Sequence, residues 1–238
     1  MKRAIMVGLL LAVLAAPVWA DTFFSEEVTC PLCGEAFSYL SQGSGSSYDR
    51  QLDTKKVGPI IDPWPVAVCP KCHLVVIDEL SDQEMIEKIR PFIRSVEYQK
   101  LAEDNTSHFL LAKIGEFLQK SPYSIAYLYL QASWQMFEEK YPEYAQLSLD
   151  YFQTCLSDSI HPDEVLEINL ICTDLERRTG QFAKAGERLF QIKQLAGADE
   201  LGWIIEYQLS LIESEDKAAH LFSEAREAWQ KTHPDSTD

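Results

Sequence analysis

Val28-Thr29-Cys30-Pro31-Leu32-Cys33-Gly34 is the first of two short cysteine motifs around which this chain is organised, and the second is Val68-Cys69-Pro70-Lys71-Cys72-His73. Each motif has the form Cys-Pro-x-Cys and follows a β-branched run. The proline stiffens the turn, and Gly34 stands where a positive φ is usual after such a turn. Two pairs of thiolates form the ligand set of a closed tetrahedral zinc site. The sequence therefore predicts one structural zinc ion with the ligands Cys30, Cys33, Cys69 and Cys72.

The second motif allows two other interpretations. Cys69 to His73 also has the C-x-x-C-H form by which c-type haem is attached, with His73 as the proximal ligand. The candidates for a distal ligand are Met85, His108 and His161. In a third interpretation the pair Cys69 and Cys72 carries out thiol–disulfide exchange, although redox-active pairs usually begin a helix and a β-branched run follows this one. The haem interpretation leaves Cys30 and Cys33 without a role.

The residues around the two motifs predict a small zinc-ribbon-like domain over residues 21–80. Val66-Ala67-Val68 and Leu74-Val75-Val76-Ile77 have the composition of short strands, which would make the second motif the tip of a hairpin. The spacer from Gly34 to Val68 is longer than in a compact ribbon. Within this spacer, Ser41-Gln42-Gly43-Ser44-Gly45-Ser46-Ser47 predicts an inserted flexible loop.

Residues 1–20 are predicted to be a secretory signal peptide. Lys2 and Arg3 precede an apolar run from Ile5 to Ala16, and small residues follow at the expected cleavage positions. No later apolar stretch is long enough to span a bilayer. We therefore expect an exported protein that starts near Asp21 and is periplasmic or secreted.

The charge balance limits the choice of partner. The chain carries 37 acidic residues against 21 lysines and arginines, and its net charge is −16, or −18 once Lys2 and Arg3 are removed with the signal peptide. This excess of negative charge argues against nucleic acid and anionic membrane surfaces as partners. It favours a protein or peptide partner of basic character.

From Ser81 onward the hydrophobic pattern is that of helices. Ser81-Asp82-Gln83-Glu84 reads as a capping box, Ser121-Pro122 as an N-cap followed by a first-turn proline, and Gly180 as a C-cap. Pro91 is expected to break or restart the first helix. The predicted helices span residues 81–90, 92–103, 106–119, 122–140, 142–157, 162–178, 181–196, 199–213 and 216–231.

These helices show signs of an internal repeat. Two dipeptides recur 38 residues later, Tyr144-Ala145 as Phe182-Ala183 and Phe152-Gln153 as Phe190-Gln191. The turn around Gly180 resembles that of a tetratricopeptide repeat. Stacked helix hairpins bury one continuous core and present a concave face to a partner. The expected core residues include Trp134, Phe137, Leu175, Leu189 and Trp203.

The remaining cysteines and histidines indicate no active site. Cys155 and Cys172 are expected to be reduced core residues, because a helix hairpin would offset them by about 10 Å along its axis, beyond disulfide reach. The histidines are scattered, and neither a phosphate-binding loop nor a nucleophile motif is recognisable. We therefore expect a protein that is not an enzyme.

The cysteine motifs and the helices together resemble a bacterial family of unknown function. The resemblance rests on Val28–Phe37, on Asp62–Cys72, on Ala132-Ser133-Trp134 and on the Arg177–Gly180 turn. It implies a metal-binding ribbon followed by tetratricopeptide-like helices, and it implies no activity. His73 departs from the family pattern, in which glycine is usual at this position.

The sequence thus predicts a mainly α protein, with a small β zinc ribbon over residues 21–80 and an all-α, tetratricopeptide-like helical-repeat domain over residues 81–238. The expected function is that of an exported, non-enzymatic metal-binding protein, a scaffold for protein–protein interaction or an assembly factor in the cell envelope. The alternative is a c-type haem or thiol–disulfide redox protein that uses Cys69, Cys72 and His73.

Overall fold

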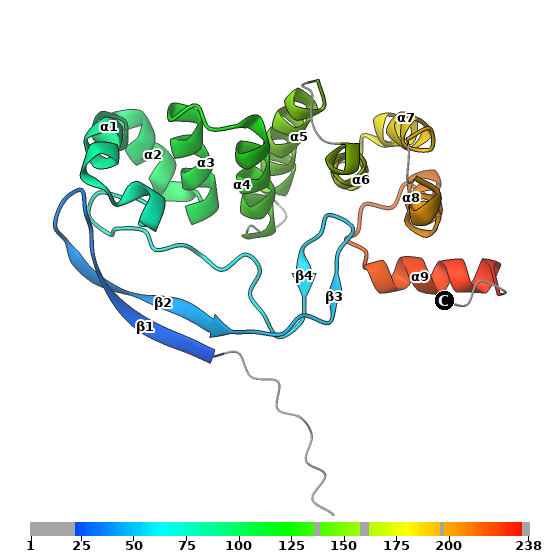
Figure 1. Ribbon diagram of the computed structural model, residues 1–238, viewed down its shortest axis with the longest axis horizontal. Coiled ribbons are helices and arrows are strands. Elements are labelled where there is room, and N and C mark those ends of the chain that lie inside the picture. Colours follow the sequence, from blue (N-terminus) through cyan, green and yellow to red (C-terminus); the bar gives the residue numbers. More distant parts are fainter. Residues whose placement is uncertain (1–21, 136–138, 158–161, 196–197, 235–238) are drawn as a thin grey trace, which may run out of the picture.

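The computed structural model describes residues 22–135, 139–157, 162–195 and 198–234. The predicted signal peptide, Phe137 and His161 lie outside these residues. Figure 1 shows the helices in one curved row, with the N-terminal strands along its concave side. The predicted fold class, a small β ribbon followed by a helical domain, is confirmed.

The helices follow the sequence signals closely. Their bounds are α1 (Gln83–Ile93), α2 (Val96–Asp104), α3 (Ser107–Phe117), α4 (Pro122–Gln135), α5 (Tyr141–Ser157), α6 (Pro162–Arg178), α7 (Phe182–Ile192), α8 (Gly202–Glu213) and α9 (Phe222–Thr232). Two 3₁₀ turns, η1 (Asp78–Leu80) and η2 (Ala198–Leu201), precede α1 and α8. Within the described part of the chain, none of the helices has both the length and the apolar character needed to cross a membrane.

The repeat is built from three helix hairpins. The pairs α4 with α5, α6 with α7, and α8 with α9 pack against each other, and α5 contacts α6 as α7 contacts α8. The first helix of each hairpin begins at Pro122, Pro162 or Gly202, so the repeat length is 40 residues. One fully buried alanine recurs at this spacing in the second helix of each hairpin, as Ala145, Ala185 and Ala225.

The 38-residue recurrence seen in the sequence does not mark equivalent positions. Phe152 is completely buried, whereas Phe190 is 72% exposed. A two-residue offset from the 40-residue repeat turns a side chain by about 200° around the helix, which accounts for the difference. Among the expected core residues, Leu175 and Leu189 are buried, while Trp134 and Trp203 are half-buried.

The start of α1 differs from the predicted capping box. Asp82 rather than Ser81 is the N-cap, and its carboxylate accepts a hydrogen bond from the Met85 N–H at 3.0 Å. Ser81 closes the η1 turn instead and donates its hydroxyl to the Ile77 carbonyl at 2.7 Å. Pro91 lies inside α1 rather than between two helices. Only two residues of α1 follow Pro91, so the hydrogen bond that the proline removes disturbs only the last turn of the helix.

The start of the last helix also differs from the prediction. Residues 216–221 were predicted as helix, but α9 begins only at Phe222. The buried Arg177 donates hydrogen bonds to the carbonyls of Asp216 at 2.6 Å and Ala218 at 2.9 Å. These hydrogen bonds hold residues 216–221 in an irregular conformation, so the helix does not extend over them.

The first cysteine motif is the tip of a long β-hairpin. Strand β1 (Thr22–Thr29) pairs antiparallel with β2 (Ala36–Ser44). The prediction of a flexible loop is therefore wrong for residues 41–44, where Ser41 pairs with Phe24. The Ser41 hydroxyl donates to the Glu26 carboxylate across the strands. The tight turn at the motif sets the register, and the ladder continues through these small polar residues.

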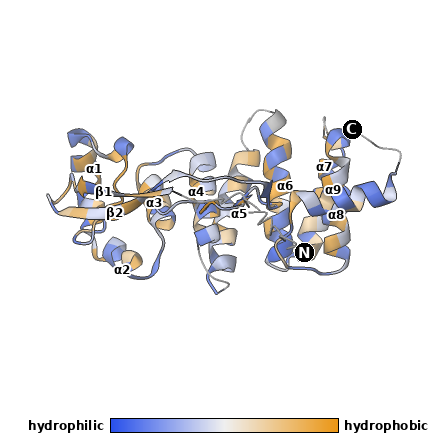
Figure 2. Ribbon diagram, turned by 90° about the horizontal axis from the view of Figure 1, so that it is seen from below, coloured by the Kyte–Doolittle hydropathy of each residue, from blue (hydrophilic) through white to orange (hydrophobic). Residues whose placement is uncertain are grey.

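Residues 49–68, which we call the strap, lie against the helices rather than in solvent. They include β3 (Asp49–Arg50) and β4 (Lys56–Val57), which Figure 1 places on the concave side of α6 and α8. Leu52 is 1% exposed within the core of α6–α9, and its N–H donates to the His220 carbonyl at 3.0 Å. The view from below in Figure 2 shows β1 and β2 running along the middle of the same side. The chain itself therefore covers the face that the repeat was expected to offer to a partner.

Candidate metal centre

The two cysteine motifs form knuckles with the same backbone hydrogen bonds. In the first, the Cys30 N–H donates to the Glu35 carbonyl at 2.8 Å and the Gly34 N–H to the Cys30 carbonyl at 2.9 Å. In the second, the corresponding bonds run from Cys69 to Leu74 and from His73 to Cys69, each at 2.9 Å. Gly34 has φ of +75° and His73 has φ of +61°. His73 thus adopts the left-handed conformation that glycine adopts in the first knuckle.

The knuckles bring the four cysteine sulfurs close together. The Sγ atoms of Cys30 and Cys72 are 3.6 Å apart, and those of Cys33 and Cys69 are also 3.6 Å apart. All four lie within 4.8 Å of one another. Zn–S bonds of about 2.3 Å imply tetrahedron edges of about 3.8 Å. The sulfur arrangement therefore fits a tetrahedral metal ion of this size.

Without a metal ion, the environment of the thiols favours the protonated form of two of them. Cys30 and Cys69 are buried, and Cys33 and Cys72 are half-buried. Burial raises the pKa of the Cys30 and Cys72 thiols. Burial also acts to raise the pKa of Cys33, but hydrogen bonds from the Glu35 backbone and the other thiols lower it. A metal ion would take the place of the thiol protons and stabilise the thiolates.

Residues outside the knuckles hold them in place. Gln99 donates its amide to the Cys72 carbonyl at 3.0 Å, and its oxygen lies 2.9 Å from Nδ1 of His73. The Tyr98 hydroxyl donates to the His73 carbonyl at 2.9 Å. Between the knuckles, Lys71 forms an ion pair with Glu35 at 3.1 Å. No local sequence pattern indicates a role for Gln99, because α2 meets the second knuckle only in the folded chain.

The knuckles belong to the same hydrophobic core as the first helices. Leu32, Leu74 and Val75 pack in one buried cluster with residues of α1–α4, including Ile86 and Ile89. Loss of a metal ion bound at the knuckles would therefore affect α1 as well as the ribbon.

In the described parts of the chain, the four knuckle cysteines form the only group of three or more His, Cys, Asp or Glu side chains placed to share a metal ion.

Two of the other candidate ligands, Met85 and His108, lie elsewhere in the described structure. His108 is 7% exposed in α3, Met85 packs against the core formed by the knuckles and α1–α4, and His161 lies outside the described residues. Cys155 and Cys172 are both buried in the core of α4–α6, as expected for core residues. Burial raises the pKa of Cys172 to about 12.

An ion pair between the fully buried Asp53 and the largely buried Arg178, which the sequence did not predict, fastens the strap. The Asp53 carboxylate accepts hydrogen bonds from Nη1 of Arg178 and from the Trp134 indole, both at 2.8 Å. Burial raises the pKa of Asp53, and the Arg178 guanidinium opposes this shift. Because 125 positions separate Asp53 from Arg178, no local pattern could have indicated the pair.

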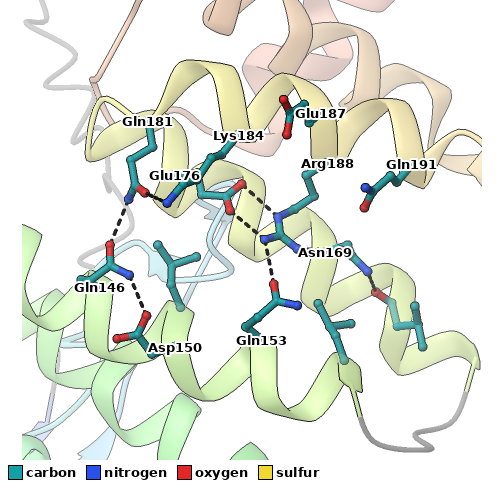
Figure 3. Close-up of a pocket in the computed structure, with 13 residues that line it drawn as sticks. Gln146, Asp150, Gln153, Asn169, Glu176, Gln181, Lys184, Glu187, Arg188 and Gln191 are labelled. Atoms are coloured by element: carbon teal, nitrogen blue, oxygen red, sulfur yellow. Dashed lines mark hydrogen bonds and ion pairs between the residues drawn. The ribbon is translucent and has the colours of Figure 1, made fainter.

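A polar groove of about 560 Å³ lies between α5, α6 and α7 (Figure 3). At its centre Arg188 forms hydrogen bonds with both carboxylate oxygens of Glu176, at 2.9 and 2.7 Å, and with Oδ1 of Asn169 at 2.9 Å. The carboxamides that line it are Gln146, Gln153, Asn169, Gln181 and Gln191. The groove uses a different face of α6 from the strap.

The fold and the site together define a protein with four clustered cysteines on a small β ribbon, followed by stacked helix hairpins. The family model described as "Uncharacterized protein conserved in bacteria (DUF2225)" matches residues 23–232, and the chain belongs to this family. The resemblance to a bacterial family of unknown function is thereby confirmed. No curated protein and no solved structure matches the chain.

Proposed function

We propose that this protein is an exported, non-enzymatic scaffold of the cell envelope. One structural zinc ion, bound by Cys30, Cys33, Cys69 and Cys72, fixes the ribbon on a helical-repeat body that binds a protein partner. The observation that carries the proposal is the convergence of the four sulfurs within 4.8 Å. Four thiolates complete the tetrahedron and leave no position for a substrate.

The placement of the second motif supports zinc over the haem alternative. Cys69 and Cys72 each lie 3.6 Å from a cysteine of the first motif, so the two pairs share one centre. Covalent attachment of haem would separate these sulfurs from their partners. The imidazole of His73, which would be the proximal ligand, is half-buried and hydrogen-bonded to Gln99.

The groove of Figure 3 is the proposed partner site, because the strap covers the concave side. Carboxamides both donate and accept hydrogen bonds and can pair with the backbone of an extended peptide. Arg188 is neutralised by Glu176. Of the other charged residues that line the groove, Asp150 and Glu187 outnumber Lys184, and none of the three has an ion pair among the described residues. A basic peptide segment therefore fits both the groove and the net charge of −16.

A capture experiment with matched variants tests this function. The zinc-loaded chain without its predicted signal peptide is immobilised, and envelope extract is applied at about 0.05 M and 0.5 M salt, between which screening changes strongly. We expect a basic partner whose capture falls at high salt and falls with Asp150→Lys in the groove. Glu213→Lys, an equal charge change at an exposed position of α8, is the control. Equal capture by both variants, or salt-independent capture of a neutral or acidic protein, would contradict the proposal.

A further inference from the structure

A second cavity, of about 430 Å³, opens where the strap meets the ends of the helices. Lys55 of the strap, Trp134 at the end of α4, Tyr141 at the start of α5 and Arg178 at the end of α6 line it. Lys217, in the connection between α8 and α9, completes the described wall. Five segments of the chain therefore converge on this space.

The charge of this cavity is opposite to that of the protein. Lys55, Arg178 and Lys217 line it, and no aspartate or glutamate is among its described lining residues. The whole chain has 37 acidic residues against 21 basic ones. Three cations around one small cavity would repel one another, and an anion between them would remove this cost.

Of the three cations, Arg178 is paired with carboxylates, whereas the two lysines are not paired in the part of the chain that the structure describes. Nη1 of Arg178 lies 2.8 Å from Asp53 and 3.7 Å from Asp174, and its guanidinium lies 4.2 Å from the centroid of the Tyr141 ring. Nζ of Lys55 donates to the Trp134 carbonyl at 3.0 Å. Burial and the Arg178 charge both lower the pKa of Lys55, although the Asp53 carboxylate opposes this shift. Among the described residues, neither Lys55 nor Lys217 forms an ion pair at hydrogen-bonding distance.

A donor without an acceptor lies beside these cations. The hydroxyl of Tyr141 is buried and has no hydrogen-bond partner among the described residues. Burial raises the pKa of Tyr141 well above its usual value, so the hydroxyl keeps its proton at neutral pH. A buried donor left unpaired costs about 1–3 kcal/mol. The hydroxyl has almost no accessible surface, so a ligand oxygen would recover this cost only after a small shift of the ring toward the cavity.

We propose that this cavity binds the oxyanion group, carboxylate or phosphate, of a small organic molecule. Lys55, Arg178 and Lys217 neutralise the negative charge, and the Tyr141 hydroxyl donates a hydrogen bond to one of its oxygens. The face of Trp134 packs against the rest of the molecule. The site is independent of the groove of Figure 3 and of the proposed protein partner.

The test uses the zinc-loaded chain and the NMR signal of the Trp134 indole N–H, which is held by Asp53 at 2.8 Å. Inorganic phosphate and succinate are titrated separately at constant ionic strength. We expect a saturable shift with at least one of them, with Kd below about 1 mM. Saturation by phosphate alone identifies a phosphate ligand, and saturation by succinate alone a carboxylate ligand.

Two variants separate binding from folding. Lys217→Gln changes an exposed side chain and should weaken binding at least tenfold, whereas Lys88→Gln on the exposed face of α1 should leave binding unchanged. Tyr141→Phe keeps the ring beside Arg178, removes only the unpaired hydroxyl, and should weaken binding several-fold without lowering stability. No saturable shift with either anion, or equal affinity of Lys217→Gln and Lys88→Gln, would overturn the proposal.

Discussion

Replacing Leu52 by alanine should loosen the strap from the helical row. Leu52 is 1% exposed and packs in the core of α6–α9 with Leu166 and Leu170. The change removes three carbon atoms from that core. At about 0.8 kcal/mol for each buried methylene group, the transfer cost is about 2.4 kcal/mol. The remaining cavity adds up to about 1 kcal/mol if the neighbours do not close it.

We therefore expect Leu52→Ala to lower the free energy of unfolding by about 2.5–3.5 kcal/mol. Ile61→Ala is the matched control, because Ile61 lies on the same strap but is 46% exposed. Its cost should stay below about 1 kcal/mol. Urea unfolding of the zinc-loaded chain gives both free energies.

Hydrogen exchange shows where the stability is lost. The Leu52 N–H donates to the His220 carbonyl, whereas the Gln51 N–H donates to the Lys55 carbonyl within the strap. In Leu52→Ala the amide of residue 52 should exchange faster than in the native chain, while protection at the cysteine knuckles stays native. If Leu52→Ala costs no more than Ile61→Ala, or if the amide of residue 52 keeps its protection, the strap is not anchored through Leu52.

Three further substitutions test other parts of the account. Arg177→Met should cost about 3–5 kcal/mol in urea unfolding. It removes the 2.6 Å ion pair of the buried Asp174, which keeps only the 3.7 Å contact with Arg178, and it removes the hydrogen bonds to the Asp216 and Ala218 carbonyls. Asp174→Leu in the same chain should recover part of the loss, and full stability of the single variant would contradict this. His73→Gly should change the free energy of unfolding of the zinc-loaded chain by less than about 1 kcal/mol, because glycine adopts the positive φ without strain and this offsets the lost hydrogen bond to Gln99. His73→Val should cost more, and equal effects of the two variants would contradict the left-handed conformation. Burial lowers the pKa of His108, so the folded state binds fewer protons than the unfolded state, and stability is lost as pH falls below the unfolded value of about 6.5. Denaturation at pH 7 and pH 5 should show a smaller loss for His108→Leu than for the native chain, and equal losses would refute the assignment.

The parts of the fold set by neighbouring residues could be predicted from the sequence. Both knuckles and the hairpin turn of the second follow from the Cys-Pro-x-Cys motifs. The strands predicted at 66–68 and 74–77 are not formed, and these segments share only an isolated bridge between Val68 and Val75. The cap at Ser121 and the C-cap at Gly180 are also local, and both are present, with Gly180 at φ of +80°. Local turn and cap chemistry is the same whatever the rest of the chain does.

The strap could not be predicted, because it depends on contacts between distant segments. Leu52-Asp53 stands in a polar stretch that has the composition of a loop, yet Leu52 enters the core of α6–α9 and Asp53 pairs with Arg178. The irregular segment before α9 has the same origin, since its carbonyls accept hydrogen bonds from Arg177. Sequence periodicity reports which face of an element is apolar, but it does not say which distant segment will cover that face.

The proposed zinc ion at the four knuckle cysteines is tested most directly by the metal content of the purified chain, together with X-ray absorption at the zinc edge. We predict one zinc per chain with four sulfur ligands at about 2.3 Å, and loss of that zinc in Cys30→Ser and Cys69→Ser but not in Cys155→Ser. Nitrogen or oxygen ligands, a zinc content unaffected by the knuckle substitutions, or a covalent haem in place of zinc would contradict the account.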